Sequence, residues 1–227
     1  MEKLYSILKQ CELFQGLNEA DIKELLEKAD TIQKSYIKAD YILRTGNKTN
    51  YIGVVISGKA IVLQEDLWGN RNVITKLYPG NFFAEPFAIV PNTVSSVSVQ
   101  AIMDCTIFGL NIRKLLASDL TGASYHLLVQ NLITACARKL LISNDKITHV
   151  SKRKTREKLL SYLSAQSIKS SSLTFDIPYD RQQLADYLCV DRAAMSVELS
   201  KLQKEGILKT NHNHFELSEK FITSMSK

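Results

Sequence analysis

The stretch RQQLADYLCVDRAAMSVELS, residues 181–200, decides the fold of the C-terminal part of the chain. Its apolar residues recur at helical spacing on both sides of a turn near residues 189–191, so it predicts two short helices. The side chains that would hold the two helices together are Leu184, Leu188, Met195 and Leu199. Ala185 is small where one helix would cross the other. The stretch therefore predicts a helix-turn-helix, which cannot bury its apolar residues alone and needs neighbouring elements.

The flanking segments supply those neighbours. Before the pair, TREKLLSYLSAQ at 155–166 predicts an amphipathic helix that Thr155 caps. After it, ILKTNHNHFELS predicts a hairpin at 207–217, because a polar turn separates two alternating strands. A helix, a helix-turn-helix and a hairpin together make a winged helix, which we expect over residues 151–227.

The second helix of the pair has a small apolar face, which leaves its other face available for DNA. A helix of this kind fits the major groove, and its N-terminal residues reach the edges of the bases. Arg192 would pair with guanine, whereas Ala193 and Val197 would contact only thymine methyl groups. The residues expected at the DNA, several of them on phosphates, are Arg181, Gln182, Asp191, Arg192, Ala193, Ser196, Val197, Lys201, Lys209 and His212. A winged helix that binds a protein or only packs is the alternative, and Cys189 stands where such turns usually have glycine.

The composition indicates an intracellular protein with a basic C-terminal part. Of the 227 residues, 45% are hydrophobic, and the formal net charge is +6. Residues 151–227 carry 13 Lys+Arg against 9 Asp+Glu, so most of the excess positive charge lies there and favours a polyanionic partner. The four cysteines form no C-x-x-C pair, and the chain shows no signal peptide and no apolar run of membrane length. We therefore expect a soluble cytoplasmic protein that does not engage a membrane.

Residues 31–110 alternate apolar and polar residues in short segments such as YIGVVIS, KAIVLQ and VSVQAI. Turn residues divide these segments, among them Gly46 and Gly80. Several short strands at regular spacing predict an antiparallel, jelly-roll-like β-roll of about eight strands. Before them, Asn18 is expected to cap a helix. The sequence thus predicts an α+β chain whose first domain, residues 1–118, joins an N-terminal helix to a β-roll.

A long helix should follow, because residues 123–150 contain neither glycine nor proline. One set of its side chains repeats with the spacing of three and four that is typical of a coiled-coil seam: Ile133, Cys136, Leu140, Ser143 and Ile147. Leu127, Leu128, Leu132 and Leu141 point elsewhere, and we expect them on the β-roll. The segment 119–150 is therefore predicted to dimerise two copies of the chain. A helix that is buried wholly within its own chain is the alternative.

The chain strongly resembles the Crp/Fnr superfamily of bacterial transcription regulators, which has these elements in this order. The resemblance covers nearly the whole chain and is carried by LFQGLNEADIKELL, YIGVVISGKAIVLQEDLWGNR, SKRKTREKLLSYL and RQQLADYLCVDRAAMSVELSKLQKEGIL. It implies a homodimer that binds a two-fold symmetric site in double-stranded DNA. It also implies a small-molecule effector for the β-roll and a contact with RNA polymerase.

The sequence departs from this resemblance at the effector site. Members that bind cyclic nucleotides carry a Glu for the ribose hydroxyl and, ten residues on, an Arg-Ser/Thr pair for the phosphate. Here the segment is FFAEPFAIVPNTVSSVSVQA, in which Glu85 matches the Glu but Ser95 and Ser96 stand at the pair. Loss of such an Arg costs about 2–5 kcal/mol of binding. We therefore expect an effector other than cAMP at Glu85, Ser95 and Ser96, between the β-roll and the long helix.

The sequence also permits other interpretations of single residues and of the function. Glu85 could be a polar relic, and a signalling protein that binds cyclic nucleotides and a protein partner is the alternative function. Cys105 lies near an iron–sulfur position of the superfamily, but Cys105 and Cys11 cannot hold a four-iron cluster within one subunit. His212 and His214 are expected to be solvated or to face phosphate rather than a metal. No motif of a nucleophile, metalloprotease or phosphate loop is present, so we expect no enzyme, metal or cofactor.

Overall fold

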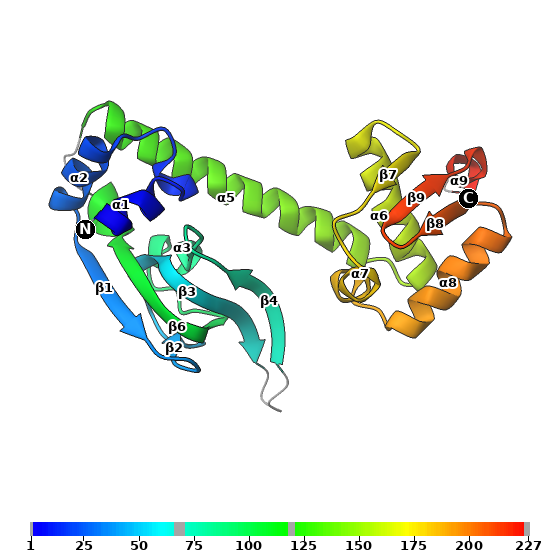
Figure 1. Ribbon diagram of the computed structural model, residues 1–227, viewed down its shortest axis with the longest axis horizontal. Coiled ribbons are helices and arrows are strands. Elements are labelled where there is room, and N and C mark those ends of the chain that lie inside the picture. Colours follow the sequence, from blue (N-terminus) through cyan, green and yellow to red (C-terminus); the bar gives the residue numbers. More distant parts are fainter. Residues whose placement is uncertain (1, 66–70, 118–120, 225–227) are drawn as a thin grey trace. The chain divides into compact units, whose positions relative to one another are not determined.

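The computed structural model describes residues 2–65, 71–117 and 121–224 (Figure 1). The chain forms two compact units, Met1–Ala137 and Arg138–Lys227, and the boundary between them falls inside a long helix. The predicted division at residues 118 and 150 stays a prediction. Among the described residues, no helix is both long enough and apolar enough to cross a membrane.

The N-terminal unit begins with short helices: α1 (Glu2–Leu8), the 3-10 turn η1 (Glu12–Phe14) and α2 (Glu19–Lys28). Asn18 caps α2 as predicted, because its side chain accepts from the backbone N–H of Asp21 at 2.9 Å. The Asp21 carboxylate returns a bond to the Asn18 N–H at 3.2 Å. This reciprocal pair satisfies two backbone donors that the first turn of a helix leaves without partners.

An antiparallel sheet forms the body of this unit. Its strands are β1 (Thr31–Tyr36), β2 (Tyr41–Leu43), β3 (Tyr51–Glu65), β4 (Arg71–Leu77), β5 (Phe82–Phe83) and β6 (Ser98–Asn111). The order is β1-β6-β3-β4, with β2 paired to β6 and β5 paired to β3. The prediction of about eight strands was wrong for the described residues, since YIGVVIS and KAIVLQ lie in the one strand β3. Gly58, at a φ of +80°, lets β3 shift its register and continue rather than end.

The sheet has an apolar layer on each face. On one face, side chains of β3 and β6 pack with α1, α2 and the first half of α5 (Ala123–Val150); Ile52, Phe108 and Leu128 belong to this layer. On the opposite face, Val55 and Ile107 pack with residues of β2 and β5. Successive residues of a strand point to opposite faces, which explains how β3 and β6 serve both layers. The short helices α3 (Glu85–Ile89) and α4 (Ile112–Leu116) follow β5 and β6.

The bounds of α5 confirm the predicted helix at 123–150. Leu128 and Leu132 are buried against the sheet, as expected. Leu141 was expected on the β-roll as well, but it is 66% exposed. Among the described residues, the part of α5 that packs in the layer under the sheet is its first half, which ends at Cys136.

The C-terminal unit is a winged helix, as predicted. Its elements after α5 are α6 (Thr155–Ser170), β7 (Thr174–Asp176), α7 (Arg181–Leu188), α8 (Arg192–Lys204), β8 (Leu208–Asn211), β9 (His214–Leu217) and α9 (Glu219–Ser224). The predicted hairpin is β8–β9, and β7 adds a third strand in the order β7-β9-β8. Thr155 is the first residue of α6 rather than its cap, a position that Lys154 occupies. Leu184, Leu188 and Met195 are fully buried in the core of this unit.

Candidate functional site

The turn between α7 and α8 sets the angle between these two helices. Asp180 and Asp191 cap the two helices, and the Asp191 carboxylate accepts from the Ala194 N–H at 2.8 Å. Cys189 takes the left-handed conformation, with a φ of +52°, where glycine would be favoured. Lys158 of α6 donates to the carbonyls of Leu188 and Cys189, at 3.2 and 3.3 Å. These contacts hold a strained turn in one shape.

The first two turns of α8 present an exposed face. Arg192, Ala193 and Ser196 are exposed, and Val197 is 56% exposed. The opposite face, with Met195, Leu199 and Leu202, is buried in the core. The structure therefore places the predicted base-reading residues on one surface. The Ser196 hydroxyl donates to the Arg192 carbonyl at 2.9 Å, which leaves its oxygen to accept a bond from outside.

An ion-pair network that the sequence does not predict orients α8. Arg156 of α6 contacts Glu198 at 3.2 Å and Glu205 at 2.5 Å. Hydrogen bonding to Glu205 raises the pKa of Arg156, and the same contact lowers the pKa of Glu205. The partners are 42 and 49 residues apart, so no local spacing marks them. Arg156 thus acts through α8 as a positioning residue.

The residues predicted to hold phosphates take different positions. Gln182, Lys201, Lys209 and His212 are exposed, and Gln182 and Lys201 also contact acidic neighbours on their own helices. Arg181 differs from the prediction of a surface contact. Its guanidinium lies 5.1 Å from the Phe215 ring and donates to the Thr210 hydroxyl at 2.7 Å. Its Nη1 is buried without a hydrogen-bond partner, and burial lowers the pKa of Arg181. Arg181 therefore ties α7 to the wing.

The predicted effector residues lie close together along the chain, and two of the three are buried. Glu85 is buried at the start of α3, Ser95 is buried, and Ser96 is exposed. The Ser95 hydroxyl donates to the Val97 carbonyl at 2.6 Å, so its proton is already used. The backbone of Ser95 is bonded to the neighbouring turn, accepting from Gly46 N–H at 2.7 Å.

A cavity of about 450 Å³ lies elsewhere in the β-roll. Its lining comes from β1, β2, the turn after β2, and the facing parts of β3, β5 and β6. Gly53, Gly109 and Ile107 place it on the face of the sheet opposite to the one that packs on α5. No residue of α5 lines it within the described part of the chain, in contrast to the expected pocket between the roll and the long helix.

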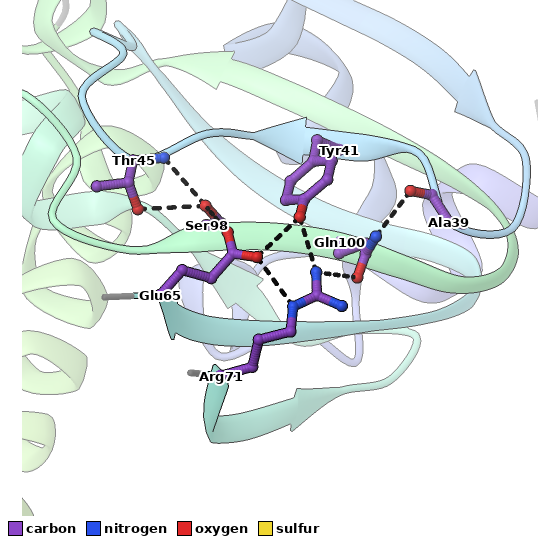
Figure 2. A network of polar contacts seen from close by, with 7 residues as sticks. All are labelled: Ala39, Tyr41, Thr45, Glu65, Arg71, Ser98 and Gln100. Atoms are coloured by element: carbon purple, nitrogen blue, oxygen red, sulfur yellow. Dashed lines mark hydrogen bonds and ion pairs between the residues drawn. The ribbon is translucent and has the colours of Figure 1, made fainter. Parts of the chain in front are cut away.

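Tyr41, which lines the cavity, also belongs to a polar network (Figure 2). The Tyr41 hydroxyl donates to Glu65 at 2.9 Å and accepts from Arg71 at 2.7 Å. Arg71 also donates to Glu65 at 2.9 Å. Hydrogen bonding from Tyr41 holds the pKa of Glu65 below its usual range. The Thr45 N–H donates to the Ser98 hydroxyl at 3.1 Å, so the network joins β2 and its turn to β3, β4 and β6.

The predicted dimer seam on α5 is largely uncovered. Ile133, Leu140 and Ile147 are 64%, 61% and 60% exposed, and Ser143 is exposed too. Cys136 is partly buried beside the layer under the sheet. The three exposed residues are seven apart, which puts them on one stripe of a helix in a coiled coil. An apolar stripe of this kind is unusual on a surface that stays in water.

The thiols and histidines show no metal-binding arrangement. Cys11 and Cys105 are both buried, in the layers on opposite faces of the sheet. His212 stands at the tip of the β8–β9 hairpin, and His214 bonds to Asp176 at 2.8 Å. Within residues 2–65, 71–117 and 121–224, no three His, Cys, Asp or Glu side chains gather as metal ligands would.

Comparisons with known proteins agree with this architecture. Residues 33–117 match the family model of the cyclic nucleotide-binding domain, and residues 157–219 match that of the Crp-like helix-turn-helix domain. The transcriptional activator protein FnrL of Cereibacter sphaeroides is 22% identical over 184 residues, which are 77% of this chain and 71% of FnrL. The chain is thus of the class that joins a cyclic-nucleotide-binding-type roll to a DNA-binding winged helix.

Two solved structures have the same fold at low identity. CprK complexed with OCPA superposes with a TM-score of 0.61 at 10% identity, over 89% of this chain and 92% of CprK. The c-di-GMP responsive global regulator CLP of Xanthomonas campestris gives a TM-score of 0.53 at 17% identity, over 88% of this chain and 99% of CLP. With both domain models matched in order, the chain belongs to the Crp/Fnr family of transcription regulators.

Proposed function

We propose that this regulator is a cytoplasmic homodimer that binds a two-fold symmetric site in double-stranded DNA and responds to a small-molecule effector. It contacts RNA polymerase and performs no catalytic step itself. The observation that carries the proposal is the exposed face at the start of α8, where Arg192, Ala193 and Val197 project from a helix whose other face is buried.

This face suits direct reading of bases. The Arg192 guanidinium can donate two hydrogen bonds to O6 and N7 of guanine, and Ala193 and Val197 can contact thymine methyl groups. Asp191 holds the first turn of α8 through its cap, and Ser196 lies one turn after Arg192. The exposed Gln182, Lys201, Lys209 and His212 are proposed to fix the register through phosphates. Arg181 supports this contact from within, because it ties α7 to the wing.

The exposed stripe of α5 supports the dimer. Two copies that bury Ile133, Leu140 and Ile147 against each other remove these side chains from water, while Cys136 and Ser143 fill the smaller positions between them. A two-fold dimer presents two α8 helices to two half-sites of opposite orientation. We therefore propose a DNA site with two-fold symmetry.

The effector is proposed to be other than a cyclic nucleotide. At the position of the phosphate-binding Arg stands Ser95, whose hydroxyl is bonded within its own turn. Glu85 and Ser96 complete the remnant of the cassette, which offers no cation for a buried phosphodiester.

The Arg192 side chain gives the test. The full chain is used to select its DNA site from a random pool, and affinities are then measured for the wild type, Arg192→Ala and Arg192→Lys. Arg192→Ala should lose roughly 1–3 kcal/mol and relax preference at one base position in each half-site. Arg192→Lys keeps the charge without the planar fork, so it should recover affinity but only part of the base preference. Unchanged affinity and preference in Arg192→Ala would refute this assignment.

A further inference from the structure

The charged side chains that line the cavity in the β-roll are all positive among the described residues. Lys34, Arg44 and Lys48 line it, and the described lining contains no carboxylate. Neither Lys34 nor Lys48 forms an ion pair with any residue that the structure describes. Like charges that converge on a concave surface raise the local concentration of anions. A negatively charged ligand would therefore find unpaired cations in this cavity.

Aromatic and apolar side chains form one part of the cavity wall. The rings of Tyr36, Tyr41 and Tyr51 face it together with Phe83 and Ile107. Its floor includes Gly53 and Gly109, which are paired across β3 and β6. A methyl group on Gly53 would come within 2.3 Å of the Phe83 ring, so the missing side chain lets this ring pack against the strand. A space walled by aromatic rings accepts a planar apolar body.

One cation of the set is already oriented. The Arg44 guanidinium stacks on the Tyr41 ring at 3.8 Å. The Tyr41 ring is in turn fixed by hydrogen bonds of its hydroxyl to Glu65 and Arg71 (Figure 2). A donor that is held before binding loses little side-chain entropy when an anion arrives.

We propose that this cavity binds a small organic anion, with the anionic head among Lys34, Arg44 and Lys48 and a flat apolar body against the tyrosines and paired glycines. The inference rests on the proposed function, because this anion would be the effector. The turn that bears Arg44 and Lys48 is bonded to the cassette remnant, where the Ser95 N–H donates to the Asn47 carbonyl at 2.8 Å. A ligand that pulls on this turn therefore acts directly on the segment that leads into β6.

Calorimetry of the full chain with three probes of one shape tests the charge requirement. The probes are 2-naphthoate, 2-naphthyl phosphate and the neutral 2-naphthamide. At least one of the two anions should bind about tenfold more tightly than the amide, because charge-assisted hydrogen bonds are the stronger ones. The preferred anion tells whether the natural head is a carboxylate or a phosphate. Equal binding of all three probes, or of none, would overturn the proposal.

Paired variants test the location. Lys34→Gln with Lys48→Gln should weaken the anion about tenfold and leave the amide unchanged, since both lysines are exposed and removable without loss of packing. Lys38→Gln is the matched control: Lys38 is exposed between β1 and β2 but does not line the cavity, so this variant should bind like the wild type. An anion that binds equally to the double variant would place the site elsewhere and refute the inference.

Experiments that contradict the anion site and experiments that contradict the proposed function give different results. DNA binding that depends on Arg192 but ignores the naphthyl anions would leave the regulator in place and remove this ligand class. Anion binding that depends on Lys34 and Lys48, in a protein that selects no DNA site, would support the cavity and remove the proposed function.

Discussion

At the scale of single residues, the buried His149 links the stability of the C-terminal unit to its own protonation. It is 4% exposed near the end of α5, and its Nδ1 lies 2.9 Å from the Ser161 hydroxyl. Its ring packs edge-on against Tyr162, at 5.6 Å, and near Tyr187. Burial in this aromatic cluster lowers the pKa of His149 and raises the pKa of Tyr187 to about 12. Lys169 and Lys152 lower the pKa of His149 further, whereas Asp145 opposes them.

This burial predicts that the C-terminal unit loses stability in mild acid. Because the folded pKa is lowered, stability is complete above the ordinary value of about 6.5 and falls as the pH drops below it. The protection factors of α6 and α7 amides, which are corrected for the intrinsic pH dependence of exchange, should therefore fall between pH 7 and pH 5. His149→Gln should flatten this dependence, and His126→Gln, an exposed histidine of the other unit, should not. An equal slope in His149→Gln would show that another group sets it.

At the scale of elements, the exposed apolar stripe of Ile133, Leu140 and Ile147 on α5 leads to a testable prediction. Leu140→Glu would place a charge in the centre of the proposed seam, and we expect association to weaken by about a hundredfold or more, ~2.7 kcal/mol. Sedimentation should show monomers, and binding to a two-fold symmetric DNA site should be lost.

The neighbouring residue supplies the control for this experiment. Leu141 is as exposed as Leu140, at 66% and 61%, but lies outside the seven-residue repeat. Leu141→Glu should therefore remain dimeric. A Leu140→Glu protein that sediments like the wild type would exclude the seam as the interface.

Some helices and strands could be predicted from the sequence, whereas others could not. The bounds of α5 and the pair α7–α8 follow from local periodicity and from caps such as Asp191, which the sequence displays. The merging of predicted segments into β3 depends on Gly58 and on pairing with a distant strand. The cavity likewise needs residues from β1 to β6 to meet, and Arg156 needs Glu198 of another helix. Contacts across such separations leave no periodic trace in the chain.

At the scale of the whole molecule, the cassette remnant and the β-roll cavity together favour an effector other than a cyclic nucleotide. The cassette remnant has Ser95 where members that bind cyclic nucleotides have an Arg, so the phosphodiester would lack the bidentate partner that it has in those members. Calorimetry of the full chain with cAMP and cGMP should show no heat of binding. Micromolar binding of either, with a matching rise in DNA affinity, would contradict this expectation.

The paired glycines have a consequence for how this family member changes over evolutionary time. Gly53 and Gly109 face each other across β3 and β6, and a Cβ at either position would meet Phe83 or Ile32 at under 3 Å. A substitution at either glycine therefore requires a neighbouring side chain to move as well. Lys34, Arg44 and Lys48 are exposed and can change one at a time. Descendants of this protein should therefore differ in the head group they accept before they differ at the paired glycines.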